Sequence, residues 1–207
     1  ELYLTSNTST PLVTIVGPLT RAAVIFSICA AAYGCNQAAA TGKAEALRRV
    51  QPTYDKSTGK LTKLSYDSNA NGKHDTWAFM DGARIVRLEA DENEDGQIDR
   101  WEHYPAADTA SIKQVPERID RSTHSDGKVS RREFFEAGAL VRIEEDVDGN
   151  GAADKWETYV SGALATLALD TAGRGTADRR FIYRPDGSLD RIEADPSGSG
   201  QFQPVKQ

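Results

Sequence analysis

The clearest folding signal in this chain is the stretch at residues 156–170, WETYVSGALATLALD. Aromatic and aliphatic residues lie on both sides of a central Ser161-Gly162 pair, and glycine is common in the two-residue turns of β-hairpins. A helix this short with a central glycine would be only marginally stable in water. The stretch therefore predicts an antiparallel hairpin that turns at Ser161-Gly162.

A two-residue turn fixes which side chains face each other across the hairpin. Counting outward from the turn gives one pair near it and a second pair three residues further away. Because neighbouring side chains in a strand alternate, these two pairs are expected on opposite faces. Either both faces are then partly covered, or one presents exposed tryptophan as a contact surface. The expected pairs are Tyr159 with Leu164, Trp156 with Leu167, Met80 with Ile85, and Trp77 with Leu88.

The hairpin belongs to a repeat of about 24 residues, which is visible when the chain is aligned on one glycine. An aliphatic residue lies eight positions before each glycine, and all three tryptophans lie five positions after one. The one long interval holds an insertion, part of PAADTASIKQVPE. The glycines that mark the repeat are Gly72, Gly96, Gly127, Gly151, Gly175 and Gly200.

We therefore expect an all-β fold, namely an antiparallel β-meander of about six 24-residue hairpin repeats. Tight glycine turns lie at one edge of the sheet and Asp-rich loops join the hairpins at the other. The sheet is expected to be curved or to form an open barrel.

The Asp-rich loops match the D-x-[DN]-x-[DN]-G-x5-E pattern of a calcium loop in two copies. Ca²⁺ takes six to eight hard oxygen ligands, and alternating side chains in a tight loop converge on one point. Glycine in sixth place allows the bend, and the seventh residue offers its carbonyl oxygen. The candidate ligands of these two copies are Asp91, Asn93, Asp95, Gln97, Asp99 and Glu102, and then Asp146, Asp148, Asn150, Ala152, Asp154 and Glu157.

The other copies depart from the pattern by degrees. The copy at residues 67–75 lacks only the final glutamate, which Ala78 replaces. The copy after Arg121 is rich in Ser and His, and the copy at residues 170–178 has Ala172 and Arg174 at two ligand positions. The last copy, DPSGSGQ, keeps one acid. The candidate ligands of the copy at residues 67–75 are Asp67, Asn69, Asn71, Lys73 and Asp75.

The loops resemble the D-x-D-x-D-G-x-x-D calcium loops that lie between β-strands in the propeller blades of integrin α-subunits. They are also similar to acidic repeats of bacterial surface lipoproteins. EF-hand loops lie between helices instead, and the flanks here are too short and too rich in glycine and aromatics for helices. The resemblance implies a calcium site in which the ninth-position aspartate is a ligand. Glu102 and Glu157 would then be strand residues.

A second interpretation of the loops needs no metal, because Asp, Asn and Gly also form good turns and protect sheet edges. Five carboxylates in one loop would, however, repel one another without a cation.

Arginines nine residues before the repeat glycine are expected to form a ladder with neighbouring glutamates on the sheet. An anion-binding surface is the alternative. The arginines are Arg87, Arg118, Arg142 and Arg191, with Glu89 and Glu144 among their expected partners.

The N-terminal part of the chain predicts export. Residues 22–34, AAVIFSICAAAYG, form an apolar run between Arg21 and Cys35, too short to span a bilayer comfortably. The ending AYGC resembles a bacterial lipobox, which implies lipidation of Cys35. Ordinary secretory cleavage after residues 30–32, or a buried helix, are the alternatives. We expect a targeting segment at 1–34, a tether at 35–50 and a repeat domain at 51–207.

The net charge of −6 argues against nucleic acid as a partner. Common hydrolase, zincin and nucleotide motifs are missing from the sequence. We therefore expect a non-enzymatic, calcium-binding repeat protein of the bacterial envelope with a binding or scaffold role. Its partners would be calcium and another envelope protein or a surface glycan, with membrane contact only through a lipid anchor. The alternatives are a secreted or envelope hydrolase with a carboxylate site at the repeat edge, and a purely structural repeat without metal.

Overall fold

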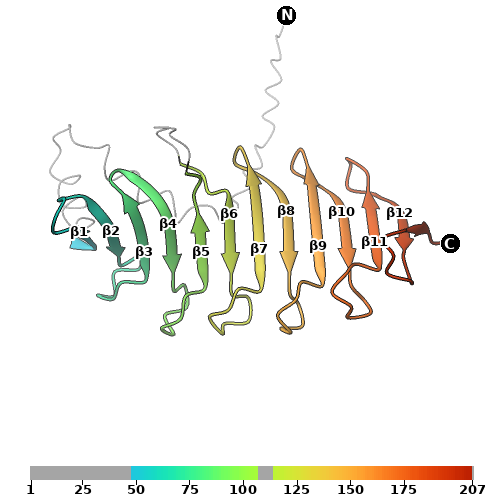
Figure 1. Cartoon of the computed structure of the whole chain (residues 1–207), viewed down its shortest axis with the longest axis horizontal. Helices are drawn as coiled ribbons and strands as arrows, with labels where there is room; N and C mark the ends of the chain where they lie inside the picture. Colours follow the sequence, from blue (N-terminus) through green and yellow to red (C-terminus); the bar gives the residue numbers. More distant parts are fainter. Residues whose placement is uncertain (1–47, 107–113, 207) are drawn as a thin grey trace, which may run out of the picture. The chain divides into compact units, whose positions relative to one another are not determined.

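The computed structural model describes residues 48–106 and 114–206. These residues form one antiparallel sheet whose strands pair in chain order, so the predicted all-β meander is confirmed (Figure 1). The sheet is open and does not close on itself. Its strands are β1 (Val50–Tyr54), β2 (Leu61–Tyr66), β3 (Thr76–Asp81), β4 (Arg84–Ala90), β5 (Arg100–His103), β6 (Arg118–Arg121), β7 (Arg131–Glu136), β8 (Ala139–Glu145), β9 (Lys155–Val160), β10 (Ala163–Leu169), β11 (Arg179–Tyr183), β12 (Leu189–Ala194) and β13 (Gln203–Pro204).

The predicted two-residue turn between β9 and β10 is present. Val160 pairs with Ala163, so the chain reverses at Ser161-Gly162. Both turn residues have positive φ, 52° and 80°, as a type I′ turn requires. This turn follows the right-handed twist of the flanking strands and fixes the start of the register.

The predicted pairing next to the turns is confirmed. The predicted pairing further from the turns is wrong by one residue. Tyr159 lies opposite Leu164, whereas Trp156 lies opposite Ala168 rather than Leu167. The reason is a β-bulge, which inserts one unpaired residue into the second strand. The bulge recurs at the same place in five hairpins, with Thr62, Val86, Val141, Ala165 and Asp190 as the extra residues.

The bulge also corrects the prediction about the two faces of the sheet. Ile85 and Leu88 are three residues apart, but the extra residue between them returns both to the same face. This face, called the core face here, holds the aliphatic positions of the repeat. Cross-strand pairing places the tryptophans on the opposite face, called the Trp face, where they are half-buried: Trp77, Trp101 and Trp156.

The core face is buried most deeply along one cross-strand row. Leu88, Ile119 and Ile143 are each less than 5% exposed, and glutamates lie between them in the same row. Glu102, between Leu88 and Ile119, is 1% exposed. This row therefore combines apolar packing with buried charge, which must be paired to be stable.

The two edge strands each contain a proline, Pro52 in β1 and Pro204 in β13. Proline lacks the backbone N–H that a further strand would need, so it protects a sheet edge from pairing with another chain. At the first edge, Arg49 donates from Nε to the Asp67 carbonyl at 2.8 Å. Arg49 and Val50, expected in the tether, therefore belong with the sheet.

Candidate metal site

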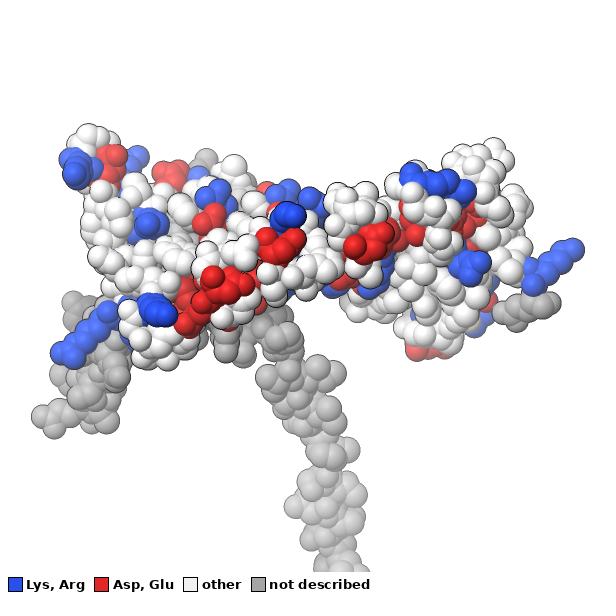
Figure 2. All heavy atoms as spheres, turned by 90° about the horizontal axis from the view of Figure 1, so that it is seen from below, with Lys and Arg blue, Asp and Glu red and all other residues white. Residues whose placement is uncertain are grey.

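Six loops join consecutive strands along one edge of the sheet, opposite the tight turns (Figure 1). Figure 2 views the sheet from this side and shows Asp and Glu side chains in a band along it. We number the loops in chain order: loop 1 (67–75), loop 2 (91–99), loop 3 (122–130), loop 4 (146–154), loop 5 (170–178) and loop 6 (195–202). All predicted ligand positions except Glu102 and Glu157 lie in loops 1, 2 and 4.

All six loops share one backbone conformation. The sixth residue is glycine with φ between 70° and 93°, as predicted. The fourth residue also has positive φ, which was not predicted from the sequence. Loops 4, 5 and 6 carry glycine there, so the signal was present in half of the copies. The fourth residues are Ala70, Glu94, Ser125, Gly149, Gly173 and Gly198.

In loops 1 to 5 the first and ninth residues hold this backbone through side-chain hydrogen bonds. In loop 4, Asp146 Oδ2 accepts the Gly151 N–H at 2.8 Å, and Asp154 Oδ2 accepts the Val147 N–H at 3.1 Å. The same contacts recur in loops 1 and 2. In loop 5 Asp170 accepts the Gly175 N–H in the same way, but Asp178 Oδ2 accepts the N–H of the third residue, Ala172. These bonds stabilise the turn with or without a metal. They are therefore consistent both with a calcium loop and with a turn that binds no metal.

In loops 4 and 5 the hydrogen bonds keep the first-position carboxylates ionised. Burial alone would raise the pKa of Asp146, but the backbone amides of Gly151, Gly149 and Asn150 outweigh it and lower the pKa below its ordinary value. The pKa of Asp170 in loop 5 is lowered against burial in the same way. Both loops therefore present charged oxygens at neutral pH.

Loop 2 contains an oxygen that the turn does not use. Asp91 is 8% exposed, and its Oδ2 accepts the Gly96 N–H at 2.9 Å. Its Oδ1 has no hydrogen-bond partner among the described residues. The amide of Asn93 lies between the other acids, with Nδ2 at 3.1 Å from Asp95 Oδ2 and 3.5 Å from Asp99 Oδ1. A buried carboxylate oxygen without a donor is costly unless a cation binds it.

Loop 4 brings three carboxylates together. One oxygen from each of Asp146, Asp148 and Asp154 lies within 4.8 Å of the others. Ca²⁺ binds oxygen at 2.3–2.6 Å, so two of its ligands can be about 5 Å apart at most. The three oxygens therefore fit around one ion. Asn150 Oδ1 and the Ala152 carbonyl belong to the same loop, and every available donor is a hard oxygen.

Loop 1 has fewer charges of its own but receives one from loop 2. The Nδ2 of Asn71 lies 2.7 and 2.6 Å from the two carboxylate oxygens of Glu94, and the Asn69 amide also contacts Glu94. Both Asp67 and Asp75 lie at the buried base of the loop. Lys73, whose carbonyl is the predicted seventh ligand, has an exposed side chain.

Loop 5 contains a cation in its own chain. The Arg174 guanidinium lies 3.7 Å from Asp178 Oδ2 and donates to the carbonyls of Pro196, at 3.1 Å, and Asp195, at 3.4 Å, in loop 6. The fifth position is Asp95 in loop 2 and Asn150 in loop 4. Loop 5 therefore shares the backbone of loops 2 and 4 but lacks oxygen side chains at its third and fifth positions.

Glu102 and Glu157, the predicted twelfth-position ligands, lie on the core face of β5 and β9. Lys155 Nζ donates to Glu157 Oε1 at 2.8 Å, and Tyr159 donates its hydroxyl proton to Oε2. Burial and this hydrogen bond raise the pKa of Tyr159 to about 12, so it stays a neutral donor. Glu102 is paired with Arg100 and Tyr104 in the same manner. Both carboxylates are therefore already paired with neighbouring residues on the sheet.

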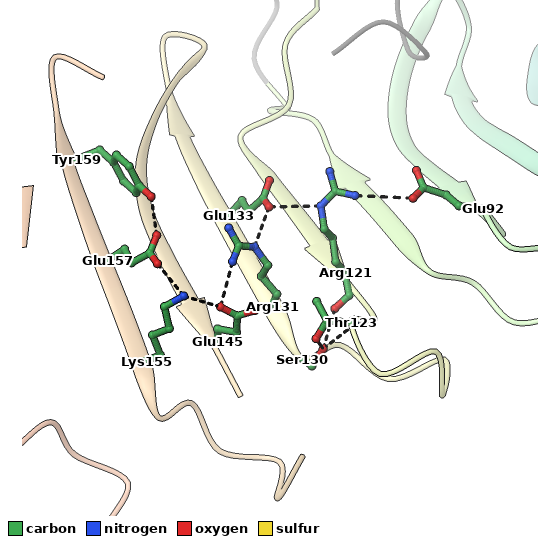
Figure 3. Close-up of polar contacts among 10 residues, drawn as sticks. All are labelled: Glu92, Arg121, Thr123, Ser130, Arg131, Glu133, Glu145, Lys155, Glu157 and Tyr159. Atoms are coloured by element: carbon green, nitrogen blue, oxygen red, sulfur yellow. Dashed lines mark hydrogen bonds and ion pairs between the residues drawn. The ribbon is translucent and has the colours of Figure 1, made fainter. Parts of the chain in front are cut away.

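These pairs are part of a polar network that crosses four strands behind the loops (Figure 3). From Lys155 it continues through Glu145 to Arg131, with nitrogen–oxygen distances of 3.1 and 3.0 Å. Glu133 then links Arg131 to Arg121, which approaches Glu92 of loop 2 at 3.9 Å. The basic residues next to the loops therefore already have acidic partners on the sheet.

The predicted arginine ladder is confirmed on the Trp face. Each arginine pairs with the acid two residues further along its own strand. The nitrogen–oxygen distances are 2.8–3.0 Å for Arg87, Arg118 and Arg191. Arg142 also lies over the Phe134 ring at 3.8 Å. The pairs are Arg87–Glu89, Arg118–Asp120, Arg142–Glu144 and Arg191–Glu193.

Comparisons with known proteins add no family. No family model and no curated protein matches the chain. Among solved structures, the sheet is similar to part of a mutant of S. aureus TarM in complex with fondaparinux, alpha-GlcNAc-glycerol and UDP. The TM-score is 0.31 and the identity 12%, over 81% of this chain and 26% of that one. A likeness at this level supports no conclusion about fold or function.

The predicted lipidation site, Cys35, and the targeting segment lie outside the described residues. Within residues 48–106 and 114–206, no helix has the length and apolar character needed to span a membrane.

Proposed function

We propose that this chain is a non-enzymatic calcium-binding repeat protein, in which loops 2 and 4 hold Ca²⁺ at the edge of a β-meander. Loop 1 is a weaker third site, because it has two carboxylates of its own. The observation that carries the proposal is the oxygen arrangement of loop 4, where three carboxylates approach within 4.8 Å of one another. The buried, unpartnered Asp91 oxygen supports loop 2 independently.

The expected ligands are side-chain oxygens from the first, third, fifth and ninth positions and the seventh carbonyl. In loop 2 they are Asp91, Asn93, Asp95, Gln97 and Asp99, and in loop 4 they are Asp146, Asp148, Asn150, Ala152 and Asp154. A bound ion would neutralise carboxylates that otherwise repel one another. Because such repulsion falls on the turns between hairpins, its relief would stiffen this edge of the sheet.

Contacts between successive loops support a scaffold role. Glu94 of loop 2 contacts Asn71 of loop 1, and His124 of loop 3 lies 3.3 Å from the Val147 carbonyl of loop 4. Ordering one loop would therefore help to order its neighbour. We place this scaffold in the bacterial envelope, anchored through Cys35, with an envelope protein or a surface glycan as its partner. The sequence of residues 22–35 motivates that part of the proposal.

The hydrolase alternative is less well supported. That alternative placed a carboxylate site at the repeat edge, and the strand carboxylates behind this edge, Glu102, Glu133 and Glu157, each pair with Arg or Lys. A purely structural repeat remains the competing account of the loops.

Calorimetric titration of the full chain with CaCl₂, after treatment with chelator, tests the calcium proposal. We expect binding with a dissociation constant on the order of 10⁻⁴ to 10⁻³ M, as in extracellular calcium modules. Asp148→Ala should remove one site and leave loop 2 unchanged. Glu136→Ala, at the opposite edge, is the matched control. No binding heat in the parent, with a folded circular dichroism spectrum, would refute the proposal.

A further inference from the structure

Loops 2 and 4 provide too few oxygens to surround a calcium ion. Their four side chains and one carbonyl give five oxygens when each contributes one, whereas Ca²⁺ takes six to eight. In EF-hand loops the twelfth-position glutamate supplies two more. Here that glutamate is held on the strand: Glu157 accepts from Lys155 and Tyr159, and Glu102 is buried against Arg100 and Tyr104. About two positions on the ion are therefore left for oxygens from outside the chain.

The loops are open to an outside ligand. In loop 4 all residues from Val147 to Ala152 are exposed, while Asp146 lies at the buried base. In loop 2 Asn93, Asp95 and Gln97 are exposed above the buried pair Asp91 and Asp99. Both loops therefore form a shallow site with a buried base and an accessible rim.

Charge limits what this outside ligand can be. Three ligand carboxylates and one divalent ion leave a net charge of −1 in each loop. Loop 2 has Glu94 beside its ligands as well, whereas the charge of Glu92 is offset by Arg100 at 3.5 Å. The nearby basic residues are already paired: Lys155 with Glu145 and Glu157, and Arg121 with Glu133. A carboxylate or phosphate would be repelled, but a neutral hydroxyl oxygen would not.

We propose that calcium in loops 2 and 4 binds neighbouring hydroxyl groups of a neutral polysaccharide. This inference rests on the calcium sites proposed above. Two adjacent sugar hydroxyls supply two neutral oxygens at the right spacing to occupy two positions on one ion. Loops 2 and 4 are four strands apart, or about 19 Å at the usual strand spacing, so one polymer can reach both. Simultaneous binding would raise the overall affinity about 10²–10⁴-fold over one site.

Terbium luminescence tests the open positions directly. Tb³⁺ replaces Ca²⁺ at oxygen sites, and Trp101 and Trp156, two residues after Asp99 and Asp154, are placed to sensitise it. Lifetimes in H₂O and D₂O count the water molecules on the ion. We expect at least two per site for the full chain, falling when yeast mannan is added. A count of zero would overturn the proposal, because the coordination sphere would be closed.

Binding of the full chain to immobilised mannan, with millimolar calcium or with chelator, completes the test. We expect binding that falls at least tenfold in chelator, and that falls similarly in Asp95→Ala and Asp148→Ala because both loops contribute. Glu136→Ala should bind like the parent. Calcium binding by calorimetry without any calcium-dependent binding to mannan or dextran would overturn this inference alone. Absence of calcium binding would refute the proposed function first. Preference for polygalacturonate, an anionic polymer, over mannan would also overturn the inference of a neutral polysaccharide.

Discussion

Loops 4 and 5 have the same backbone and differ in the charge of their side chains. Both place an aspartate at the first and ninth positions, and both carry glycine at the fourth and sixth. Loop 4 adds Asp148 and gathers three carboxylates. Loop 5 has Ala172 and Arg174 instead, and the guanidinium lies beside Asp178. The two loops therefore differ in the side chains at the third and fifth positions and not in backbone shape.

The largest effect is expected when the third and fifth positions are changed in the two acidic loops together. At ~100-fold excess of calcium over its dissociation constant, each site adds roughly 2.7 kcal/mol of stability. Asp95→Ala with Asp148→Ala should therefore lose about 5 kcal/mol of calcium-dependent stability. Chemical denaturation with calcium and with chelator measures it. If the double variant gains as much from calcium as the parent does, the ion lies elsewhere.

A smaller effect is expected when loop 5 is converted into an acidic loop. Ala172→Asp with Arg174→Asp gives DTDGDGTAD, which restores every ligand position. The variant should gain roughly 2.7 kcal/mol from saturating calcium. In chelator it should be less stable than the parent, because four carboxylates then lie in one loop without a cation. The single variant Ala172→Asp, which keeps Arg174, is the control. If calcium does not change the stability of the double variant, the backbone of loop 5, and not its charge, prevents calcium binding.

Removing only the guanidinium should have a small effect. Arg174→Met keeps much of the side-chain volume but loses the charge beside Asp178 and the bonds to loop 6. Exposed ion pairs contribute about 1 kcal/mol or less, so a loss within that range is expected. Calcium should not restore it, since two ligand positions are still missing. Full rescue by calcium would contradict the assignment of Arg174 as the built-in cation.

The smallest effect is expected from lowering the pH between 7 and 5 in chelator. The pKa values of Asp146 and Asp170 are lowered in the folded state, so these groups stabilise the fold above the unfolded-state value of about 3.9. That contribution is lost only as the pH falls through the lower folded value. Melting temperatures should be flat from pH 7 to 5 and fall below about pH 4. A loss that begins above pH 5 would indicate raised pKa values from crowded carboxylates.

The sequence predicted the meander because its repeat combines a turn signal with aliphatic positions at fixed distances. It did not predict the bulges, since the bulge position is held by residues as different as valine, alanine, threonine and aspartate. A bulge is set by backbone pairing, and any side chain can occupy it. The error in pairing Trp156 with Leu167, and the error about the faces, follow from that one missed residue.

The candidate loop ligands could be proposed from sequence because their spacing matches the chemistry of oxygen coordination. The pairing of Glu102 and Glu157 on the strands could not be predicted in this way. It depends on Arg100 and Lys155, which lie two residues earlier on the same face. The unpartnered oxygen of Asp91 also depends on three-dimensional contacts. Such features arise from how neighbouring strands are placed, which spacing within one loop does not encode.

The most direct measurement is a pair of thermal melting curves of the full chain, one in saturating calcium and one in chelator. Two occupied loops should add about 5 kcal/mol, which corresponds to a rise of at least 10 °C for a domain of this size. Magnesium at the same concentration is the control, because it prefers to keep its water ligands and should stabilise much less. Identical curves in calcium and in chelator would contradict the account and show that the acidic loops are turns alone.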